Sequence, residues 1–199
     1  MMRFQTAYDG EPPPWDIGRP QPAFVALADK LGEQLRGPIL DCGCGTGENT
    51  MLFAERGAKV LGVDVVARAI ELAKAKAAER GSSAEFQVGN ALELASLGRS
   101  FSTIIDCAVF HVFDDADRGR YLQSLASVLE PGGYYYMLVF SDRESAEWGG
   151  PRRVSQAEIR AAFQEGWQIH SIEEARVDTL LHPTGSGHGW FSTIQRLTK

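Results

Sequence analysis

The chain has 199 residues, of which 44% are hydrophobic and 23% charged, a balance typical of a globular protein with enough length for one well-packed domain. Its net charge of −6 disfavours nucleic acid and anionic membranes as partners, because both are bound through clustered Lys and Arg. No apolar run reaches the roughly 18 residues of a membrane helix, and the chain start lacks the apolar core of a signal peptide, so we expect a cytoplasmic protein.

The first distinctive segment is PPPWDIGRPQP, from Pro12 to Pro22. Proline fixes φ and pushes the preceding residue toward extended backbone, so the segment is predicted to be stiff and irregular. It is either a loose tail or a shaped piece that lies over a site built by the rest of the chain. A helix over residues 23–37 follows it.

From Gly37 onward, strand and helix patterns alternate. We expect strands over 38–43, 58–64, 84–90, 101–110 and 134–140, with helices over 48–57, 66–81 and 115–133. Strands this continuously apolar, each followed by a helix, predict a parallel sheet covered on both faces. A further helix over 154–166, with the capping-box pair Ser155 and Glu158, precedes two strand candidates over 167–180 and 190–198 that could extend the sheet at its far edge.

The strongest motif is ILDCGCGTGENT, a strand, a glycine loop and a helix start. Glycines let the backbone approach a ligand closely, and the turn after the first strand of such a sheet is where nucleotides bind. The spacing is G-x-G-x-G rather than the dinucleotide G-x-G-x-x-G, no Gly-Lys-Ser/Thr follows, and Asp41 and Glu48 would repel phosphates. The loop therefore favours a nucleoside without phosphates.

Asp64 ends the second strand, about 20 residues after the first loop glycine. A carboxylate at that place can accept hydrogen bonds from both ribose hydroxyls. The alternative is that Asp64 caps the helix that follows directly; together with the glycine loop, ribose binding is the favoured reading.

Five pieces of the chain together resemble the class I S-adenosylmethionine-dependent methyltransferases: ILDCGCGTG, VLGVD, VGNALEL, IIDCAVFHV and LEPGG, in family order over residues 37–140. The resemblance implies S-adenosylmethionine as cofactor. It also implies an α/β fold, a three-layer, doubly wound, mostly parallel seven-stranded sheet with an antiparallel last strand. One domain over 1–199 would contain a lid segment and helix (1–36), a cofactor-binding half (37–140) and an acceptor-side half (141–199).

By the same resemblance, Asp64 would hold the ribose, Val65 would lie against the adenine, and Asn90, where the family more often has Asp, would lie at the adenine edge. The implied cofactor-binding residues are Trp15, Asp41, Gly43, Gly45, Gly47, Asp64, Val65, Asn90, Ala91 and Cys107.

The proline segment is similar to the opening of the thiopurine, thiol and halide methyltransferase branch, in which a Trp-x-x-Gly segment covers the cofactor; Trp15 and Gly18 match that pattern. Excluding water lowers the barrier to transfer from a sulfonium to an anion, and a sulfonium is attracted to an aromatic face. The alternative is that Trp15 packs the helix onto the sheet.

His111 follows the fourth strand, where the family places acceptor-side residues. It could act as a general base or only touch the acceptor, since a thiol or halide needs no base. The residues expected on the acceptor side are Tyr8, Trp15, His111, Phe113 and Trp148. Lesser candidates are Arg152 and Arg153 as an anion clamp, or as solvated charges, and His182 and His188. Asp114 or Asp115 is expected at a helix N-cap.

Cys42, Cys44 and Cys107 lack a suitably spaced fourth ligand, so no metal site is expected. The favoured function is methyl transfer to S, O or N of a small, partly apolar acceptor. A non-catalytic S-adenosylmethionine-binding sensor or scaffold is the alternative, and an NAD-linked oxidoreductase is a third reading that the loop spacing weakens. The sequence does not predict the oligomeric state.

Overall fold

A computed structural model describes residues 4, 6–32, 34, 37–148 and 150–198. The elements run in the order α2 (Pro22–Leu31), β1 (Ile39–Cys42), α3 (Glu48–Glu55), β2 (Val60–Asp64), α4 (Ala67–Arg80), β3 (Glu85–Val88), η2 (Ala91–Leu97), β4 (Phe101–Cys107), η3 (Phe110–Val112), α5 (Asp115–Val128), β5 (Leu129–Phe140), α6 (Gln156–Ala162), β6 (Trp167–Asp178) and β7 (Ser186–Arg196). Here η marks a 3₁₀ helix. Within these residues, no helix is both long and apolar enough to cross a membrane.

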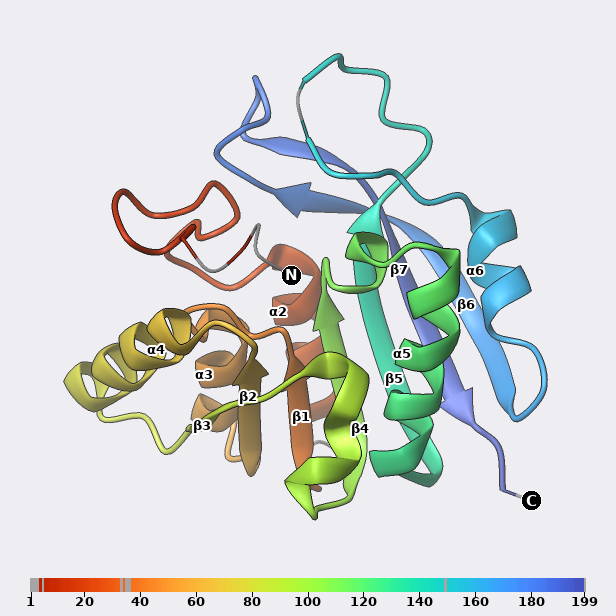
Figure 1. Cartoon of the computed structure of the whole chain (residues 1–199), viewed down its shortest axis with the longest axis horizontal. Coiled ribbons are helices and arrows are strands. Elements are labelled where there is room, and N and C mark those ends of the chain that lie inside the picture. Colours follow the sequence, from red (N-terminus) through yellow and green to blue (C-terminus); the bar gives the residue numbers. More distant parts are fainter. Residues whose placement is uncertain (1–3, 5, 33, 35–36, 149, 199) are drawn as a thin grey trace.

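The seven strands form one sheet in the order β3-β2-β1-β4-β5-β7-β6 (Figure 1). Strands β1 to β5 are paired in parallel, and β7 is antiparallel to both of its neighbours, β5 and β6. The predicted mostly parallel sheet with an antiparallel last strand is therefore confirmed. The order reverses between β1 and β4, and ligands bind outside the carboxyl ends of the strands at such a switch point.

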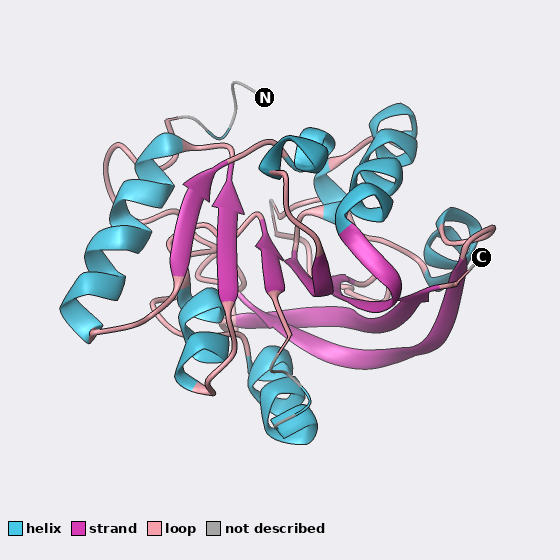
Figure 2. Ribbon diagram, turned by 90° about the horizontal axis from the view of Figure 1, so that it is seen from below, coloured by secondary structure: helices cyan, strands magenta, loops and turns pink. Residues whose placement is uncertain are grey.

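Helices cover both faces of the sheet (Figure 2). On one face, η2, α5 and α6 pack on alternate strand residues such as Leu40 and Ile104. On the other face, α2 and α3 pack on Ile39 and Ile105, and α4 packs on α3 and β3. Adjacent strand residues thus face opposite layers, which places Asp41 on the α3 side and Asp106 on the α5 side.

Two predicted boundaries were wrong. The helix expected over 115–133 ends at Val128, and β5 begins at Leu129 instead of 134. Pro131 favours extended backbone before it, and Leu129 pairs with Phe101 through a register shift in the β4–β5 ladder. Strand β7 begins at Ser186 rather than at 190, because the glycine-rich segment pairs with β6.

The helix termini agree better with expectation. Gly81 ends α4 in the left-handed conformation, Asp114 caps α5 through the Asp117 N–H, and Ser155 forms the predicted capping box with Glu158.

Candidate functional site at the carboxyl edge of the sheet

The glycine loop joins β1 to α3 in a conformation that requires glycine. Gly43, Gly45 and Gly47 have φ of 73°, 54° and 88°. A Cβ on Gly43 would lie 2.2 Å from Val109 Cγ2, and one on Gly47 would lie 2.5 Å from the Phe86 ring. The loop is therefore held against the end of β4 and against β3, at the predicted place.

The Asp64 carboxylate faces this loop. It accepts the Gly45 N–H at 3.0 Å and the Val66 N–H at 2.9 Å. Burial raises the pKa of Asp64, and these backbone hydrogen bonds oppose that shift. The N-cap of α4 is Val66 without a side-chain capping bond, so the alternative of Asp64 as that helix cap is wrong.

Asp41 lies beneath the loop with one oxygen unpaired. The Thr50 hydroxyl donates to Oδ2 at 2.6 Å, whereas Oδ1 is buried without a hydrogen-bond partner. Burial raises the pKa of Asp41 to about 7. This buried oxygen without a partner lies beside the glycine loop, which Asp64 also contacts. Such a site fits a nucleoside that carries a positive charge, such as S-adenosylmethionine.

Asp16 joins the proline segment to the glycine loop, a link that the sequence reading missed. The Thr46 hydroxyl donates to Asp16 Oδ2 at 2.8 Å, and Lys76 of α4 donates to the Thr46 oxygen at 2.7 Å. Lys76 also pairs with Glu48 at 3.0 Å, and Arg80 pairs with Glu48 at 2.7 Å. Although partial burial acts to raise the pKa of Glu48, these two cations lower it. The negative charge of Glu48 is thus balanced by two cations, so its expected repulsion of phosphates is weaker than the sequence indicated.

On both sides of Asp16, the segment binds the end of β6 and the loop that follows it. Gln21 exchanges two hydrogen bonds with the backbone of Asp178, each 2.9 Å long, and Arg19 pairs with the Asp178 carboxylate at 2.7 Å. The Pro14 carbonyl accepts the Thr179 hydroxyl at 2.9 Å and the Leu180 N–H at 2.8 Å. The segment is a shaped piece that spans the carboxyl edge of the sheet from the glycine loop to the β6–β7 loop (Figure 1).

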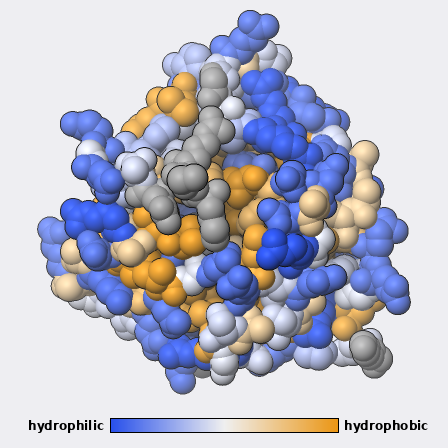
Figure 3. Space-filling view, viewed as in Figure 1, coloured by the Kyte–Doolittle hydropathy of each residue, from blue (hydrophilic) through white to orange (hydrophobic). Residues whose placement is uncertain are grey.

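Trp15 lies in this segment, and Tyr8 lies shortly before it in the chain. The Trp15 indole donates to the Tyr8 hydroxyl at 2.9 Å; Tyr8 is 6% exposed and Trp15 is 43% exposed. Val65 packs in the same cluster as Tyr8, next to the Asp64 carboxylate. Seen from the side of Figure 1, the surface carries an apolar area near its centre with hydrophilic residues around it (Figure 3).

Three other predicted cofactor residues lie at the ends of β3 and β4. Asn90 Oδ1 accepts the Leu92 N–H at 3.0 Å and so caps η2, which begins at Ala91. Burial and nearby carboxylates raise the pKa of Cys107, which keeps it a thiol. Among the described residues, no three His, Cys, Asp or Glu side chains are grouped to hold a metal.

On the acceptor side, the structure brings His111 and Trp148 together but not Phe113. His111 stacks on Phe140 with ring centroids 5.9 Å apart, and Trp148 meets the edge of Phe140 at 5.1 Å. Phe113 instead packs on the fully buried Tyr121 at 4.8 Å, in the core beneath α5. The low-ranked His182 joins the group through Trp148, at 5.2 Å.

The remaining polar candidates are engaged with protein groups. Arg152 pairs with Glu158, and Arg153 donates to the Ala146 carbonyl. His188 is exposed and donates its backbone N–H to Glu144 at 2.7 Å. Arg152 is nonetheless close enough for its charge to add to the burial that lowers the pKa of His111 to about 4.

Asp106, which sequence reasoning passed over, is the buried carboxylate at the end of β4. It accepts the hydroxyls of Tyr121 and Tyr135 and the backbone N–H groups of Val109 and Phe110. Burial raises its pKa to about 6 against these hydrogen bonds. Asp106 fixes the turn that carries His111, and its partners come from elements that no local pattern connects to it.

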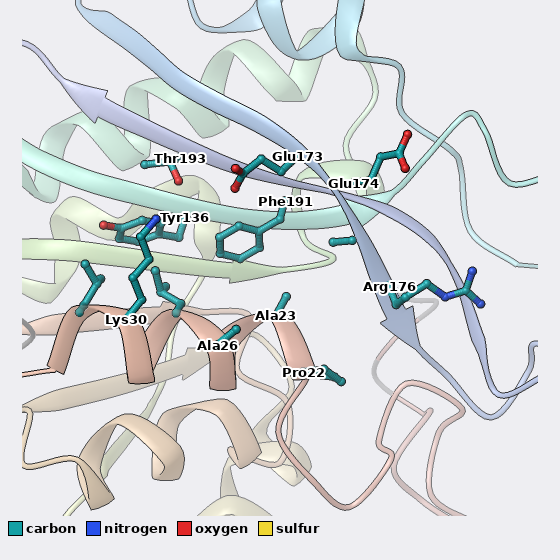
Figure 4. Close-up of a pocket in the computed structure, with 13 residues that line it drawn as sticks. Pro22, Ala23, Ala26, Lys30, Tyr136, Glu173, Glu174, Arg176, Phe191 and Thr193 are labelled. Carbon is teal, nitrogen blue, oxygen red and sulfur yellow. The ribbon is translucent and has the colours of Figure 1, made fainter.

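A cavity of about 380 Å³ lies elsewhere, between α2 and the face of the sheet formed by β5, β7 and β6 (Figure 4). Lys30, Tyr136, Glu173 and Phe191 are among its lining residues. It contains none of the glycine-loop residues and is separate from the carboxyl-edge site.

Comparison with known proteins agrees with this geometry. Residues 39–133 match the family model described as a methyltransferase domain. The 2-heptyl-1-hydroxyquinolin-4(1H)-one methyltransferase of Mycobacteroides abscessus is 35% identical over 193 residues, which cover 92% of this chain and 82% of that protein.

Solved structures agree as well. A structure from work on the conversion of a disulfide bond into a thioacetal group during echinomycin biosynthesis has a TM-score of 0.87 and 34% identity, covering 98% of this chain and 91% of that one. Magnesium protoporphyrin IX methyltransferase from Synechocystis PCC 6803 with bound S-adenosylmethionine has a TM-score of 0.68 at 21% identity, covering 87% and 76%, and supports the fold.

Proposed function

This chain belongs to the class I S-adenosylmethionine-dependent methyltransferases that act on small molecules, and from that premise we propose that its acceptor atom is an acidic hydroxyl oxygen on a planar aromatic or heteroaromatic compound. The observation that carries this proposal is the 35% identity to the hydroxyquinolinone methyltransferase. That likeness covers 92% of this chain, so it is not confined to the cofactor half.

The shape and polarity of the acceptor side support an aromatic acceptor. Aromatic rings from η3, β5 and the loop after β5 gather at the carboxyl edge of the sheet, and stacking on such rings favours flat ligands. Large apolar side chains are exposed on segments at this edge: Trp15, Val112, Leu180 and Leu181. An acceptor with apolar surface would cover part of that area.

In the proposed reaction, bound S-adenosylmethionine supplies an electrophilic methyl group: the acceptor oxygen forms a bond to that carbon, the C–S bond breaks with its electron pair going to sulfur, and the hydroxyl proton passes to solvent. The chain's own residues would act mainly by positioning the cofactor and the acceptor relative to each other. Asp64 would orient the ribose, Asp41 would balance positive charge, and the proline segment would exclude water from the reacting atoms.

A sulfur acceptor is the second candidate. It is supported by the 34% identical structure associated with disulfide-to-thioacetal chemistry. A thiol would need no general base, which agrees with the lowered pKa of His111.

A product screen would distinguish these candidates. The protein would be incubated with methyl-labelled S-adenosylmethionine and 1-hydroxyquinolin-4(1H)-one, substituted phenols, thiophenols and aliphatic amines, and products would be identified by mass spectrometry. We expect labelled O-methyl ethers of the acidic hydroxyl compounds. If only thiols were methylated, the acceptor atom would be sulfur instead of oxygen. Cofactor binding without any product would favour a non-catalytic sensor.

A further inference from the structure

Four aromatic rings form a continuous row at the carboxyl edge, in the order His111, Phe140, Trp148 and His182. They come from η3, the end of β5, the loop after β5 and the loop between β6 and β7. His111 is 5% exposed and His182 is 8% exposed. We call these four residues the ring row.

The ring row contains three buried nitrogen atoms without a hydrogen-bond partner: His111 Nδ1, Trp148 Nε1 and His182 Nε2. A buried polar group without a hydrogen-bond partner destabilises the folded protein, so three of them within one group of touching rings are unfavourable together. A ligand that supplies partners would remove this cost. The ring row is therefore a candidate binding site rather than only a packed core.

The polarity of the nitrogen atoms indicates what they would bind. The Trp148 indole can only donate. His182 Nδ1 accepts the Thr184 N–H at 3.2 Å, so the proton of a neutral imidazole is on Nε2, which is then also a donor. Glu144 Oε2 lies 3.5 Å from Nε2, too far for a strong hydrogen bond. Burial acts to raise the pKa of Glu144, but the N–H groups of Ala146 and His188, with His182 nearby, lower it to about 2, so Glu144 is an ionised carboxylate.

Nearby cations add to this preference. The Arg118 guanidinium lies 5.0 Å from the Phe110 ring centroid, its Nε is buried without a partner, and it lies 4.0 Å from Glu158, which also pairs with Arg152. Two arginines thus share one glutamate beside η3, although Arg118 also contacts Asp115 at 3.2 Å. The unpaired N–H donors favour an oxygen acceptor on the ligand, and the charge of Arg152 reaches the His111 end of the ring row.

The His111 end of the ring row lies near the glycine loop. Val109, two residues before His111, contacts Gly43 so closely that a Cβ on this glycine would lie 2.2 Å from its Cγ2. A flat molecule that reaches the His111 end of the ring row would therefore be near the glycine loop.

We propose that Trp148 Nε1 and His182 Nε2 bind the acceptor as an oxyanion, with its aromatic ring against the ring row. This inference rests on the proposed function and adds to it: the acceptor enters ionised, and these two N–H groups select it over neutral analogues.

The test is acceptor binding, measured by calorimetry in the presence of S-adenosylhomocysteine so that turnover is not needed. The probes are 4-nitrophenol, at a pH where it is ionised, and its methyl ether, which has the same ring and no charge. Trp148→Phe removes the indole donor and keeps a smaller aromatic ring, and His182→Asn keeps an acceptor for the Thr184 N–H while it removes the Nε2 donor. Trp167→Phe, on β6 and outside the ring row, is the matched control.

We expect the wild-type protein to bind the phenolate at least tenfold more tightly than the ether. Trp148→Phe and His182→Asn should each weaken phenolate binding about tenfold and leave ether binding and S-adenosylhomocysteine binding unchanged, and Trp167→Phe should change nothing. Equal wild-type affinity for the two probes, or equal losses for both in the variants, would overturn the inference. The proposed function is tested separately, by whether labelled products form in the product screen described above.

Discussion

Trp15 donates its indole N–H to the hydroxyl of Tyr8 at 2.9 Å, and that hydroxyl lies beside the glycine loop, 3.2 Å from where a Cβ on Gly45 would be. Tyr8 therefore connects Trp15 of the proline segment to the loop that is expected to hold the cofactor. Since Asp16 is bonded to Thr46 and Pro14 to the β6–β7 loop, this part of the chain is held against both loops.

The Trp15–Tyr8 pair predicts a coupling that a double-mutant cycle can measure. Tyr8→Phe and Trp15→Phe should each lower the free energy of unfolding by about 1 kcal/mol, because each removes the same hydrogen bond. The double variant should lose clearly less than the sum. Urea unfolding of the four proteins gives these values, and strict additivity would show that the bond contributes nothing to stability.

Asp64→Ala should abolish the rise in melting temperature that S-adenosylmethionine or S-adenosylhomocysteine produces in the wild-type protein. The Asp64 carboxylate is expected to bind the cofactor only by accepting hydrogen bonds from the ribose hydroxyls. Each such charge-assisted hydrogen bond contributes about 1.5–3 kcal/mol, so losing them should weaken cofactor binding tenfold or more. The measurement is a thermal shift at millimolar ligand.

Because Asp64 also accepts two backbone N–H groups, Asp64→Ala should lower the melting temperature without ligand. Asp64→Asn, which keeps one acceptor oxygen, is the control for that loss. A full ligand-induced shift in Asp64→Ala would contradict the placement of the cofactor.

Burial raises the pKa of Asp41 to about 7, and this predicts that the free energy of unfolding and the cofactor affinity change with pH in opposite directions. The folded chain holds this proton more tightly than the unfolded chain, so the free energy of unfolding should fall as pH rises from about 4 to 7. A cationic cofactor binds the ionised carboxyl better, so cofactor affinity should instead rise toward pH 7 by up to tenfold per unit and then level off.

Asp41→Asn should remove both dependences, as measured by urea unfolding without ligand and by calorimetry with S-adenosylmethionine. Subtracting the variant from the wild type also removes the contribution of Asp106, whose pKa is raised in the same direction. A cofactor-affinity slope that persists in Asp41→Asn would assign the titration to another group.

Local pattern predicted the glycine loop and the buried strands. The glycine spacing requires left-handed backbone at 43, 45 and 47, and the buried strands followed from apolar runs. The start of β5 was missed because Leu129 is extended only through pairing with Phe101, which no local signal reveals.

The acceptor side was predicted less well for the same physical reason. Trp148 and His182 touch because β7 inserts between β5 and β6, and Asp16 meets Thr46 across 30 positions of sequence. Phe113 resembled a pocket residue by its place after β4, yet the turn fixed by Asp106 directs its ring to Tyr121. Such contacts depend on tertiary pairing and not on spacing along the chain.

His111→Gln tests whether a general base is used. Burial, with a contribution from Arg152, lowers the pKa of His111 to about 4, so at neutral pH the imidazole is uncharged and a weak base. For an acidic hydroxyl acceptor that is already ionised, kcat should fall less than tenfold in the variant, and the pH profile should follow the ionisation of the acceptor. A series of phenols of increasing acidity, each compared between the two proteins, gives the measurement. Loss of 10²–10⁴ in kcat across the whole series would make His111 the base and show that acceptors enter protonated.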